Sequence, residues 1–151
     1  MDIREAKEEE FDELTNLWLD SSLEAHSFIS ADYWLENKEV IKGLYFPLSE
    51  NLIILANGRV KGFVSMMGNY LSALFLFPDS QGLGYGRKLI EYVKRDRKII
   101  QLKVYEKNEQ ACRFYERNGF KFKEKTIDEA TDEKEWLMEW EKEKNKKMEE
   151  R

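Results

Sequence analysis

A change of pattern in the middle of the chain constrains the fold more than any other feature. The run Tyr70–Phe77 is the most apolar stretch of the sequence, and Pro78 ends it. A glycine-rich turn, a segment with apolar residues at helical spacing and a strand-like run over Ile99–Tyr105 follow. Strands that are joined through a helix run parallel within one sheet. The sequence therefore predicts a crossover unit, which is typical of an α/β fold.

The segments just before this unit predict an antiparallel meander. The apolar runs 52–56, 60–67 and 70–77 are separated by Asn57–Gly58 and Gly68–Asn69, which are typical of tight turns between strands. A short strand is also expected at the start of the chain, over Ile3–Ala6.

Two helices are expected between that first strand and the meander. The first covers Glu8–Ala25, where apolar residues recur at spacings of three and four. A break at residues 26–30 separates it from the second helix, which Ser30 or Asp32 is placed to cap. The second helix is expected to use Trp34, Leu35, Ile41 and Leu44 as its apolar positions and to end near Pro47 and Ser49.

The last third of the chain completes the predicted sheet. Asn108 is placed to cap a helix that runs to Arg117, and Gly119 is placed to end it. Phe120–Thr126 and Glu135–Trp140 read as two closing strands. The predicted order is β-α-α-β-β-β-α-β-α-β-β, a mixed, mostly antiparallel sheet of about seven strands with four helices. We expect one domain over residues 1–141 and a charged tail over 142–151.

Composition excludes several classes of protein. The longest apolar run falls short of the roughly 18 residues that a membrane-spanning helix needs. The first residues show no apolar stretch behind a basic head, so we expect no secretion. A single cysteine, Cys112, fits a reducing cytoplasm, where we expect the protein to reside. With one cysteine and one histidine, we expect no metal site built from these residue types.

Charge is distributed unevenly along the chain. Residues 1–50 contain 13 acidic and 4 basic side chains, whereas residues 81–125 contain 13 basic and 6 acidic ones. An acidic first third suits a cationic partner, and a basic later segment suits a phosphate-bearing one, although ordinary solvated surface explains both. We expect neither nucleic acid nor a membrane as a partner, because the whole protein is acidic and carries few aromatic residues in the basic segment.

The glycine-rich turn Gln81–Arg87 favours anion binding. Glycines allow backbone N–H groups to approach an anion, and the start of a helix adds the positive end of its dipole. The spacing does not match a Walker A loop, because Arg87 and Lys88 follow Gly86. It does not match a dinucleotide fingerprint either, because the three glycines recur at every second residue. A purely structural turn is the alternative.

Two blocks of sequence resemble one protein family. Gln81-x-x-Gly84-x-Gly86 after an apolar strand resembles the Q/R-x-x-G-x-G/A motif of the GCN5-related N-acetyltransferases (GNAT). The segment from Val104 to Phe120, with Asn108 and Phe114–Tyr115, is similar to the family's second block. The resemblance covers nearly the whole chain. Residues 25–29 with Tyr33 and Trp34, and residues 136–140, further resemble a small bacterial branch described as acetyltransferases of protein lysines or N-terminal amines.

The resemblance implies a GNAT fold that binds acetyl-CoA between two parting strands. Backbone groups of Phe75 and Phe77 would pair with the pantetheine arm, and a backbone N–H near Leu76 would stabilise the oxyanion. The amides of the glycine turn would hold the pyrophosphate. The implied coenzyme-binding residues are Phe75, Leu76, Phe77, Gln81, Gly82, Leu83, Gly84, Tyr85, Gly86, Arg87 and Asn108.

The resemblance also implies the chemistry, which is direct attack of an amine on the acetyl thioester. Tyr115 matches the family tyrosine that gives a proton to the departing thiolate. Many relatives carry a glutamate base where this chain has Ser72 or Ala73 and Lys103. A water relay, His26 or an acid from the first fifty residues could replace that base. A ping-pong route through Cys112 is disfavoured, because the sequence shows no partner that would activate the thiol.

The expected function is transfer of an acetyl group from acetyl-CoA to a primary amine, with a protein lysine or N-terminal amine as acceptor. His26, Phe28 and Tyr33 are the residues expected to contact this acceptor. A small-molecule acetyltransferase and a non-catalytic acyl-CoA-binding module are the alternatives. The sequence leaves open whether the protein is a monomer or a homodimer, and which amine it uses.

Overall fold

The computed structural model describes residues 2–143, so residues 144–151 of the expected tail lie outside the described part of the chain. The predicted alternation of strands and helices is confirmed. The elements are β1 (Asp2–Glu5), α1 (Phe11–Ala25), α2 (Ala31–Val40), α3 (Phe46–Leu48), β2 (Glu50–Ala56), β3 (Arg59–Met67), β4 (Tyr70–Leu76), α4 (Tyr85–Lys94), β5 (Ile99–Tyr105), α5 (Glu109–Arg117), β6 (Lys121–Asp128) and β7 (Glu133–Glu141). The second predicted helix is divided into α2, a π-helical segment and the single turn α3, and it ends near Pro47 and Ser49 as expected.

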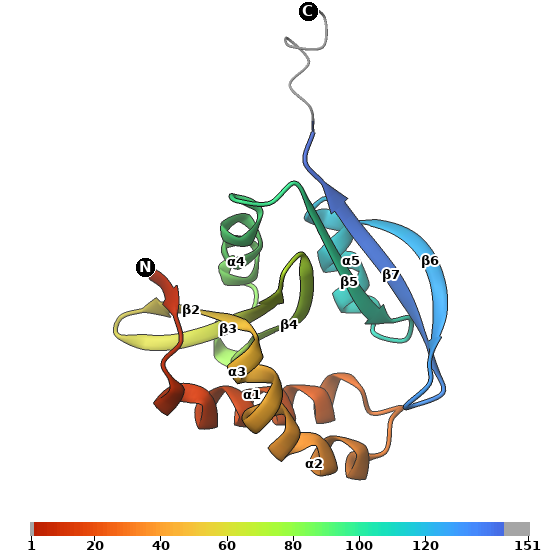
Figure 1. Cartoon of the computed structure of the whole chain (residues 1–151), viewed down its shortest axis with the longest axis horizontal. Coiled ribbons are helices and arrows are strands. Elements are labelled where there is room, and N and C mark those ends of the chain that lie inside the picture. Colours follow the sequence, from red (N-terminus) through yellow and green to blue (C-terminus); the bar gives the residue numbers. More distant parts are fainter. Residues whose placement is uncertain (1, 144–151) are drawn as a thin grey trace, which may run out of the picture.

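The strands form one mixed sheet in the order β1-β2-β3-β4-β5-β7-β6. All neighbours are antiparallel except β4 and β5, which run parallel as the crossover predicts. Figure 1 shows that α1 and α2 lie together, apart from α4 and α5. The last strand, β7, lies between β5 and β6, an order that the sequence pattern did not predict.

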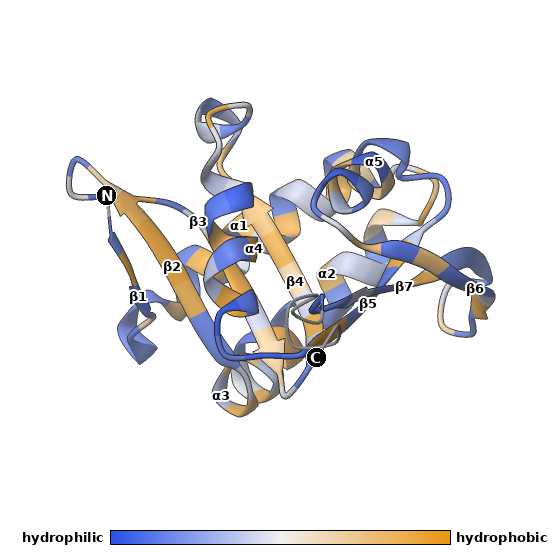
Figure 2. Cartoon of the chain, turned by 90° about the horizontal axis from the view of Figure 1, so that it is seen from above, coloured by the Kyte–Doolittle hydropathy of each residue, from blue (hydrophilic) through white to orange (hydrophobic). Residues whose placement is uncertain are grey.

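Two apolar clusters hold the helices against the two faces of the sheet. One joins α4 and α5 to the sheet through fully buried residues such as Leu89, Ile100 and Phe120. The other joins α1 and α2 to the opposite face around Leu14 and Phe63. In Figure 2, β2, β3 and β4 are largely hydrophobic, whereas β6 is largely hydrophilic. Strands β2 and β3 are buried on both faces, whereas β6 has no buried residue.

The second helix differs from its predicted burial. Trp34 is buried and meets Trp18 edge to face with ring centroids 5.7 Å apart. Leu35 and Leu44, expected on the same face, are 52% and 50% exposed. The prediction was wrong for Leu35 because it directly follows Trp34 and so lies about 100° around the helix from that buried residue. It was wrong for Leu44 because this residue lies in a π-helical segment, Ile41–Tyr45, which changes the spacing of side chains around the axis.

Local signals for turns and caps are confirmed. Asn57 and Gly58 have φ of 54° and 74°, as a two-residue hairpin turn of this type requires. Ser30 caps α2 by accepting a hydrogen bond from the Asp32 N–H, and Gly119 ends α5 with a φ of 91°. No helix within residues 2–143 is both long and apolar enough to span a membrane.

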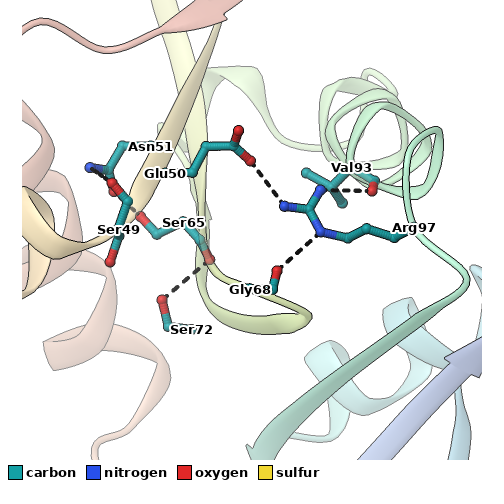
Figure 3. Close-up of polar contacts among 8 residues, drawn as sticks. All are labelled: Ser49, Glu50, Asn51, Ser65, Gly68, Ser72, Val93 and Arg97. Carbon is teal, nitrogen blue, oxygen red and sulfur yellow. Dashed lines mark hydrogen bonds and ion pairs between the residues drawn. The ribbon is translucent and has the colours of Figure 1, made fainter.

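Polar contacts fix the end of the sheet at which β4 meets β5. Arg97, just after α4, donates to the carbonyl oxygens of Gly68 and Val93 and pairs with the Glu50 carboxylate (Figure 3). Ser72 interrupts the register between β3 and β4, and its hydroxyl donates to the Ser65 carbonyl. Arg97 therefore joins the β3–β4 turn, β2 and α4 at one point.

Candidate active site

β4 and β5 part shortly after they meet, as the family resemblance implies. They pair only through Tyr70 with Gln101 and Leu71 with Leu102. Beyond these two pairs, β4 continues to Leu76 and β5 to Tyr105 without facing each other. The inner edge of each strand is therefore unpaired there, and buried backbone groups of this kind need a hydrogen-bonding partner. We call the space between the parted strands the wedge.

The register between β3 and β4 decides which backbone groups face the wedge. The Phe77 N–H donates to the Lys61 carbonyl, 3.0 Å away, so it faces β3. Phe75, two residues earlier and opposite Phe63, faces β3 for the same reason, because the bonding alternates along an antiparallel pair. The expectation that the backbones of Phe75 and Phe77 are exposed is therefore wrong. The irregularity at Ser72 turns the groups of Leu74 and Leu76 to the wedge instead.

A cleft of about 1330 Å³ extends from the wedge, and it gathers most of the predicted coenzyme residues. Leu83 and Tyr85 do not line it. Leu83 is 63% exposed, and Tyr85 packs against the apolar cluster under α4. The predicted residues that line the cleft are Phe75, Leu76, Phe77, Gln81, Gly82, Gly84, Gly86, Arg87, Asn108 and Tyr115.

The glycine turn forms the rim of the cleft at the start of α4. Gly82 and Gly84 have φ of 77° and 87°, a backbone conformation that costs other residues about 1–2 kcal/mol. Gly86 has a different role, because a Cβ there would lie 3.0 Å from the Phe114 ring of α5. The turn thus brings the free N–H groups at the start of α4 to the cleft, where they can bind an anion.

Tyr115 is the one side chain of the predicted chemistry that lies in this cleft. It is only 8% exposed and packs edge to face against Phe114 and Phe120. Burial raises the pKa of its hydroxyl well above the ordinary value, and nearby Tyr70 and Cys112 add to the effect. The phenol therefore stays protonated across the neutral range, as a proton donor requires.

Asn108 joins two segments that are far apart in the sequence. Its Oδ1 accepts a hydrogen bond from the Ala111 N–H, which confirms the predicted cap of α5. Its Nδ2 lies 3.2 Å from Nε2 of His26, a residue 82 positions away. Since the Nδ2 group of Asn108 can only donate, Nε2 of His26 accepts this hydrogen bond. The neutral imidazole of His26 therefore carries its proton on Nδ1. The loop after α1 is thereby fixed to the start of α5.

His26 itself is buried rather than open to an acceptor. It is 9% exposed and stacks on Trp34 with ring centroids 5.2 Å apart. Burial lowers the pKa of His26 to about 4, so the imidazole is neutral at pH 7. Nε2 already accepts a hydrogen bond, and a group of such low pKa binds protons weakly. These features place His26 in a structural role and make it a poor general base.

The other two predicted acceptor residues lie on the side of the sheet that carries α1 and α2. Phe28 packs edge to face on Tyr105, with ring centroids 5.7 Å apart. Tyr33 has a pKa raised by burial and by the charge of Asp128. The Tyr105 hydroxyl donates to the Asp128 carboxylate at 2.6 Å. Neither Phe28 nor Tyr33 lines the cleft, but both lie near this tyrosine–carboxylate pair.

Lys103 and Glu135 form an ion pair on the same side of the sheet as the Tyr105–Asp128 hydrogen bond. Nζ of Lys103 lies 3.7 Å from the Glu135 carboxylate, whose side chain is 12% exposed. Burial raises the pKa of Glu135, the nearby Asp128 carboxylate raises it further, and Lys103 lowers it in part. Lys103, one of the places at which the resemblance implies a glutamate, thus faces a carboxylate on β7.

Cys112 is a free, buried cysteine in α5. Burial raises the pKa of its thiol, and the thiol lies 3.7 Å from the Tyr105 carbonyl oxygen. A thiol of raised pKa carries little thiolate at neutral pH and is a poor nucleophile. The geometry therefore favours the packing role over the ping-pong route.

Sequence reasoning missed eight charged residues that line the cleft, among them two pairs of like charge on the helices α1 and α5. Asp20 and Glu24 come from α1, and Arg113 and Arg117 come from α5. The uneven distribution of charge along the sequence indicated an acidic first third and a basic later segment, but it did not identify the individual residues at the cleft. Each pair is spaced by four positions, which places its members on one side of a helix.

Comparisons with known proteins agree with this geometry. Residues 48–122 match the family model described as acetyltransferase (GNAT) domain. The chain is 34% identical over 139 residues to the peptidyl-lysine N-acetyltransferase YiaC of Escherichia coli (strain K12), and the match covers 91% of this chain and 95% of that protein.

Solved structures show the same arrangement of elements. The solution structure of apo-form YjaB from Escherichia coli matches with a TM-score of 0.81 and 29% identity, over 92% of this chain and 96% of that one. The structure of yncA from Salmonella typhimurium with its cofactor acetyl-CoA matches with a TM-score of 0.64, over 96% and 95% of the two chains. At 19% identity, this second likeness supports the fold alone.

Proposed function

Because the chain belongs to the GCN5-related N-acetyltransferase (GNAT) family, we propose that it transfers the acetyl group of acetyl-CoA to the side-chain amine of a protein lysine. The observation that carries the proposal is the wedge. β4 and β5 pair at two positions and then leave unpaired edges that open into the cleft. The name of the relative YiaC supports a peptide lysine as the acceptor.

The residues of the cleft fit the parts of acetyl-CoA. The backbone groups of Leu74 and the N–H of Leu76 suit the amides of a pantetheine arm, as a neighbouring strand would. The Leu76 carbonyl oxygen accepts a long hydrogen bond of 3.4 Å from Nε2 of Gln81, which a ligand amide can replace. The N–H groups between Gly82 and Arg87 suit a pyrophosphate, and the guanidinium groups of α5 suit a further phosphate. The volume of about 1330 Å³ is sufficient for a ligand of this length.

Three groups of this chain serve the transfer. In the proposed arrangement the thioester lies at the narrow end of the wedge, where the Leu74 N–H is available to the oxyanion. Tyr115, kept protonated by burial, gives its proton to the departing thiolate. Asp20 and Glu24 attract the cationic acceptor and are the acids of the first fifty residues that lie at the cleft.

A tyrosine substitution tests the proposal. Tyr115→Phe keeps the ring and its packing, so we expect unchanged acetyl-CoA binding by calorimetry. We expect thiol release with a lysine peptide to fall by about 100-fold or more, the usual range for loss of a general acid. Tyr92→Phe on α4 is the matched control, because Tyr92 packs beside the same apolar cluster but does not line the cleft.

The acceptor is tested in the same assay. Lysine peptides, peptides with a free N-terminal amine and polyamines are compared at equal concentration by thiol release. Turnover of the polyamine alone would reject the protein-lysine acceptor. Tight binding of acetyl-CoA with no turnover of any amine, and no effect of Tyr115→Phe, would instead identify a non-catalytic acyl-CoA-binding module.

A further inference from the structure

We propose that Lys103 is a self-acetylation site, whose amine takes the acetyl group from acetyl-CoA in the wedge when no acceptor is present. The inference rests on the proposed function, because it uses the same coenzyme and the same proton donor. It assigns a new role to the lysine at one of the places where the resemblance implies a glutamate.

The position of Lys103 places it at the narrow end of the wedge. It directly follows Leu102, which forms the last pair between β5 and β4. Leu102 and Val104 on either side of it are buried in the cluster under α4 and α5. Since side chains alternate along a strand, Lys103 projects to the opposite face, from which an acceptor can approach.

The surroundings of Lys103 leave room for its side chain to move. Its side chain is 45% exposed. Across the wedge, β4 presents the small residues Ser72 and Ala73 rather than bulky ones. Adjacent strands lie about 4.8 Å apart, a distance that the four methylenes of a lysine can span. The amine can therefore swing from β7 toward a thioester beside Leu74.

Glu135 provides the proton acceptor that this amine needs. Its carboxylate is 3.7 Å from Nζ of Lys103, which is long for an ion pair, and the Lys103 side chain is 45% exposed to water. The pair therefore opens readily. Burial and the nearby Asp128 raise the pKa of Glu135, so it accepts a proton more readily than a free carboxylate does.

The proposed step balances in atoms and charge. The Lys103 ammonium gives a proton to the Glu135 carboxylate, and the neutral amine attacks the acetyl carbon. The carbon–sulfur bond breaks, and the thiolate of coenzyme A takes the proton of Tyr115. The proton on Glu135 and the one released by the new amide nitrogen leave through solvent, and one of them restores the tyrosine. The products are acetyl-Lys103, free coenzyme A and one proton.

Self-acetylation would limit itself to one acetyl group at this site. The amide product carries no charge and no basic nitrogen, so it cannot react again. It also leaves Glu135 without its cation. Acetyl-Lys103 would then lie at the narrow end of the wedge, where the acceptor amine must enter, and we expect it to slow transfer to a peptide.

Lys107 is the natural competitor for the acetyl group. It lines the cleft, but it lies beyond β5 near the wide end of the wedge and pairs with Glu133 at 3.0 Å. Its Nζ also lies 5.4 Å from the centre of the Phe28 ring. These contacts keep it away from the narrow end, so we expect it to react only at the rate of an exposed lysine.

The test uses the full chain and mass spectrometry. The protein is incubated with acetyl-CoA and no acceptor, and acetyl groups are located by peptide mapping. We expect one acetyl group at Lys103, formed at a rate that does not change with protein concentration, because the transfer is intramolecular. Lys103→Arg should abolish it, and Lys123→Arg should leave it unchanged, because Lys123 is a half-exposed lysine on β6 that does not line the cleft.

Two further variants test the chemistry. Glu135→Gln and Tyr115→Phe should each slow acetylation of Lys103 by about 100-fold, the lower range for loss of a general base or acid. Circular dichroism and acetyl-CoA binding confirm that each variant is folded. Acetylation at an unchanged rate in Glu135→Gln would reject the role of that carboxylate and with it the proposed step.

The remaining outcomes separate this inference from the proposed function. If a lysine peptide is acetylated while Lys103 stays unmodified, the inference is wrong and the proposed function stands. If acetyl groups spread over many surface lysines at similar rates, the reaction is chemical and the inference is again wrong. If neither Lys103 nor any peptide gains an acetyl group, the proposed function fails first.

Discussion

The two halves of the sheet are built on different principles. Strands β2 and β3 are buried on both faces, and β1–β4 are held between α1 on one side and α4 on the other. Strands β5 and β7 bury residues on one face only, and β6 buries none. These three strands carry paired charges such as Lys103–Glu135 and Lys123–Glu139. The first half acts as a rigid support, and the second presents a polar surface. The wedge lies where the two halves meet.

Matched phenylalanine substitutions should show the largest difference between the halves. Phe63 on β3 is fully buried between Phe46 and Phe75, so Phe63→Ala should lower the free energy of unfolding by about 3–5 kcal/mol. Phe122 on β6 is 38% exposed and contacts Trp136, so Phe122→Ala should cost about 1 kcal/mol or less. Urea unfolding followed by tryptophan fluorescence measures both, and equal losses would contradict the comparison.

Lowering the pH should weaken the contact between His26 and Asn108, which joins the two halves of the molecule. His26 of the loop after α1 has a pKa of about 4 in the folded chain, below its ordinary value of 6.5. Between these values the unfolded chain binds a proton that the folded chain does not, so the free energy of unfolding falls as the pH falls. The slope for one group is about 1.4 kcal/mol per pH unit, or about 2 kcal/mol from pH 6.5 to pH 5.

The sole histidine offers a direct control for that effect. His26→Gln retains a side chain that can bond to Asn108 but has no group that titrates in this range. Its free energy of unfolding should depend less on pH between pH 5 and pH 7 than that of the original protein. Identical pH profiles for the two proteins would show that His26 does not couple folding to protons.

Removing two cationic side chains should also lower the free energy of unfolding by different amounts. Arg97 is 18% exposed and bonds to two carbonyl oxygens and to Glu50, so Arg97→Ala should cost about 1–3 kcal/mol. Lys107 is 59% exposed and pairs with Glu133, so Lys107→Ala should cost less than about 0.5 kcal/mol. Raising the salt concentration should weaken only the contribution of Lys107 to a marked degree. A larger loss for Lys107→Ala in the unfolding experiment would reverse the comparison.

Alanine substitutions at two glycines can distinguish an effect on stability from an effect on coenzyme binding. Gly84 and Gly58 both have positive φ, and at both the space that a Cβ would occupy is open, with no atom within 4 Å. Alanine at either position should therefore cost about 1 kcal/mol of stability, through backbone strain alone. Gly84 lies at the rim of the cleft and Gly58 in the distant β2–β3 turn. Calorimetry with acetyl-CoA should show weaker binding for Gly84→Ala alone. A similar loss for Gly58→Ala would mean that stability, and not the rim, sets the affinity.

Local chemistry made most of the fold predictable. Asn57–Gly58 determines its turn through backbone freedom, and Ser30 and Asn108 cap their helices through their own side chains. What escaped prediction depends on contacts across the fold. The irregularity at Ser72, which turns Leu74 rather than Phe75 to the wedge, arises from the pairing with β3. One shifted residue of this kind reverses which groups face each side of a strand.

The candidate site shows the same division. The motif placed Tyr115 and the glycine turn correctly at the cleft, because both are fixed by short segments of sequence. The bond between His26 and Asn108 spans 82 residues, and nothing local to either residue signals it. Glu135 faces Lys103 only because β7 pairs with β5, an order that hydrophobic patterns do not encode.

The central place of β7 has a consequence for biosynthesis. β7 is the last strand of the described chain in sequence, yet it lies between β5 and β6. While the nascent polypeptide emerges from the ribosome, β1–β4 can assemble early, whereas β6 has no neighbour until β7 is made. The wedge is thus completed late, because β5, which forms its far wall, gains its second neighbour in the sheet only when β7 has been made.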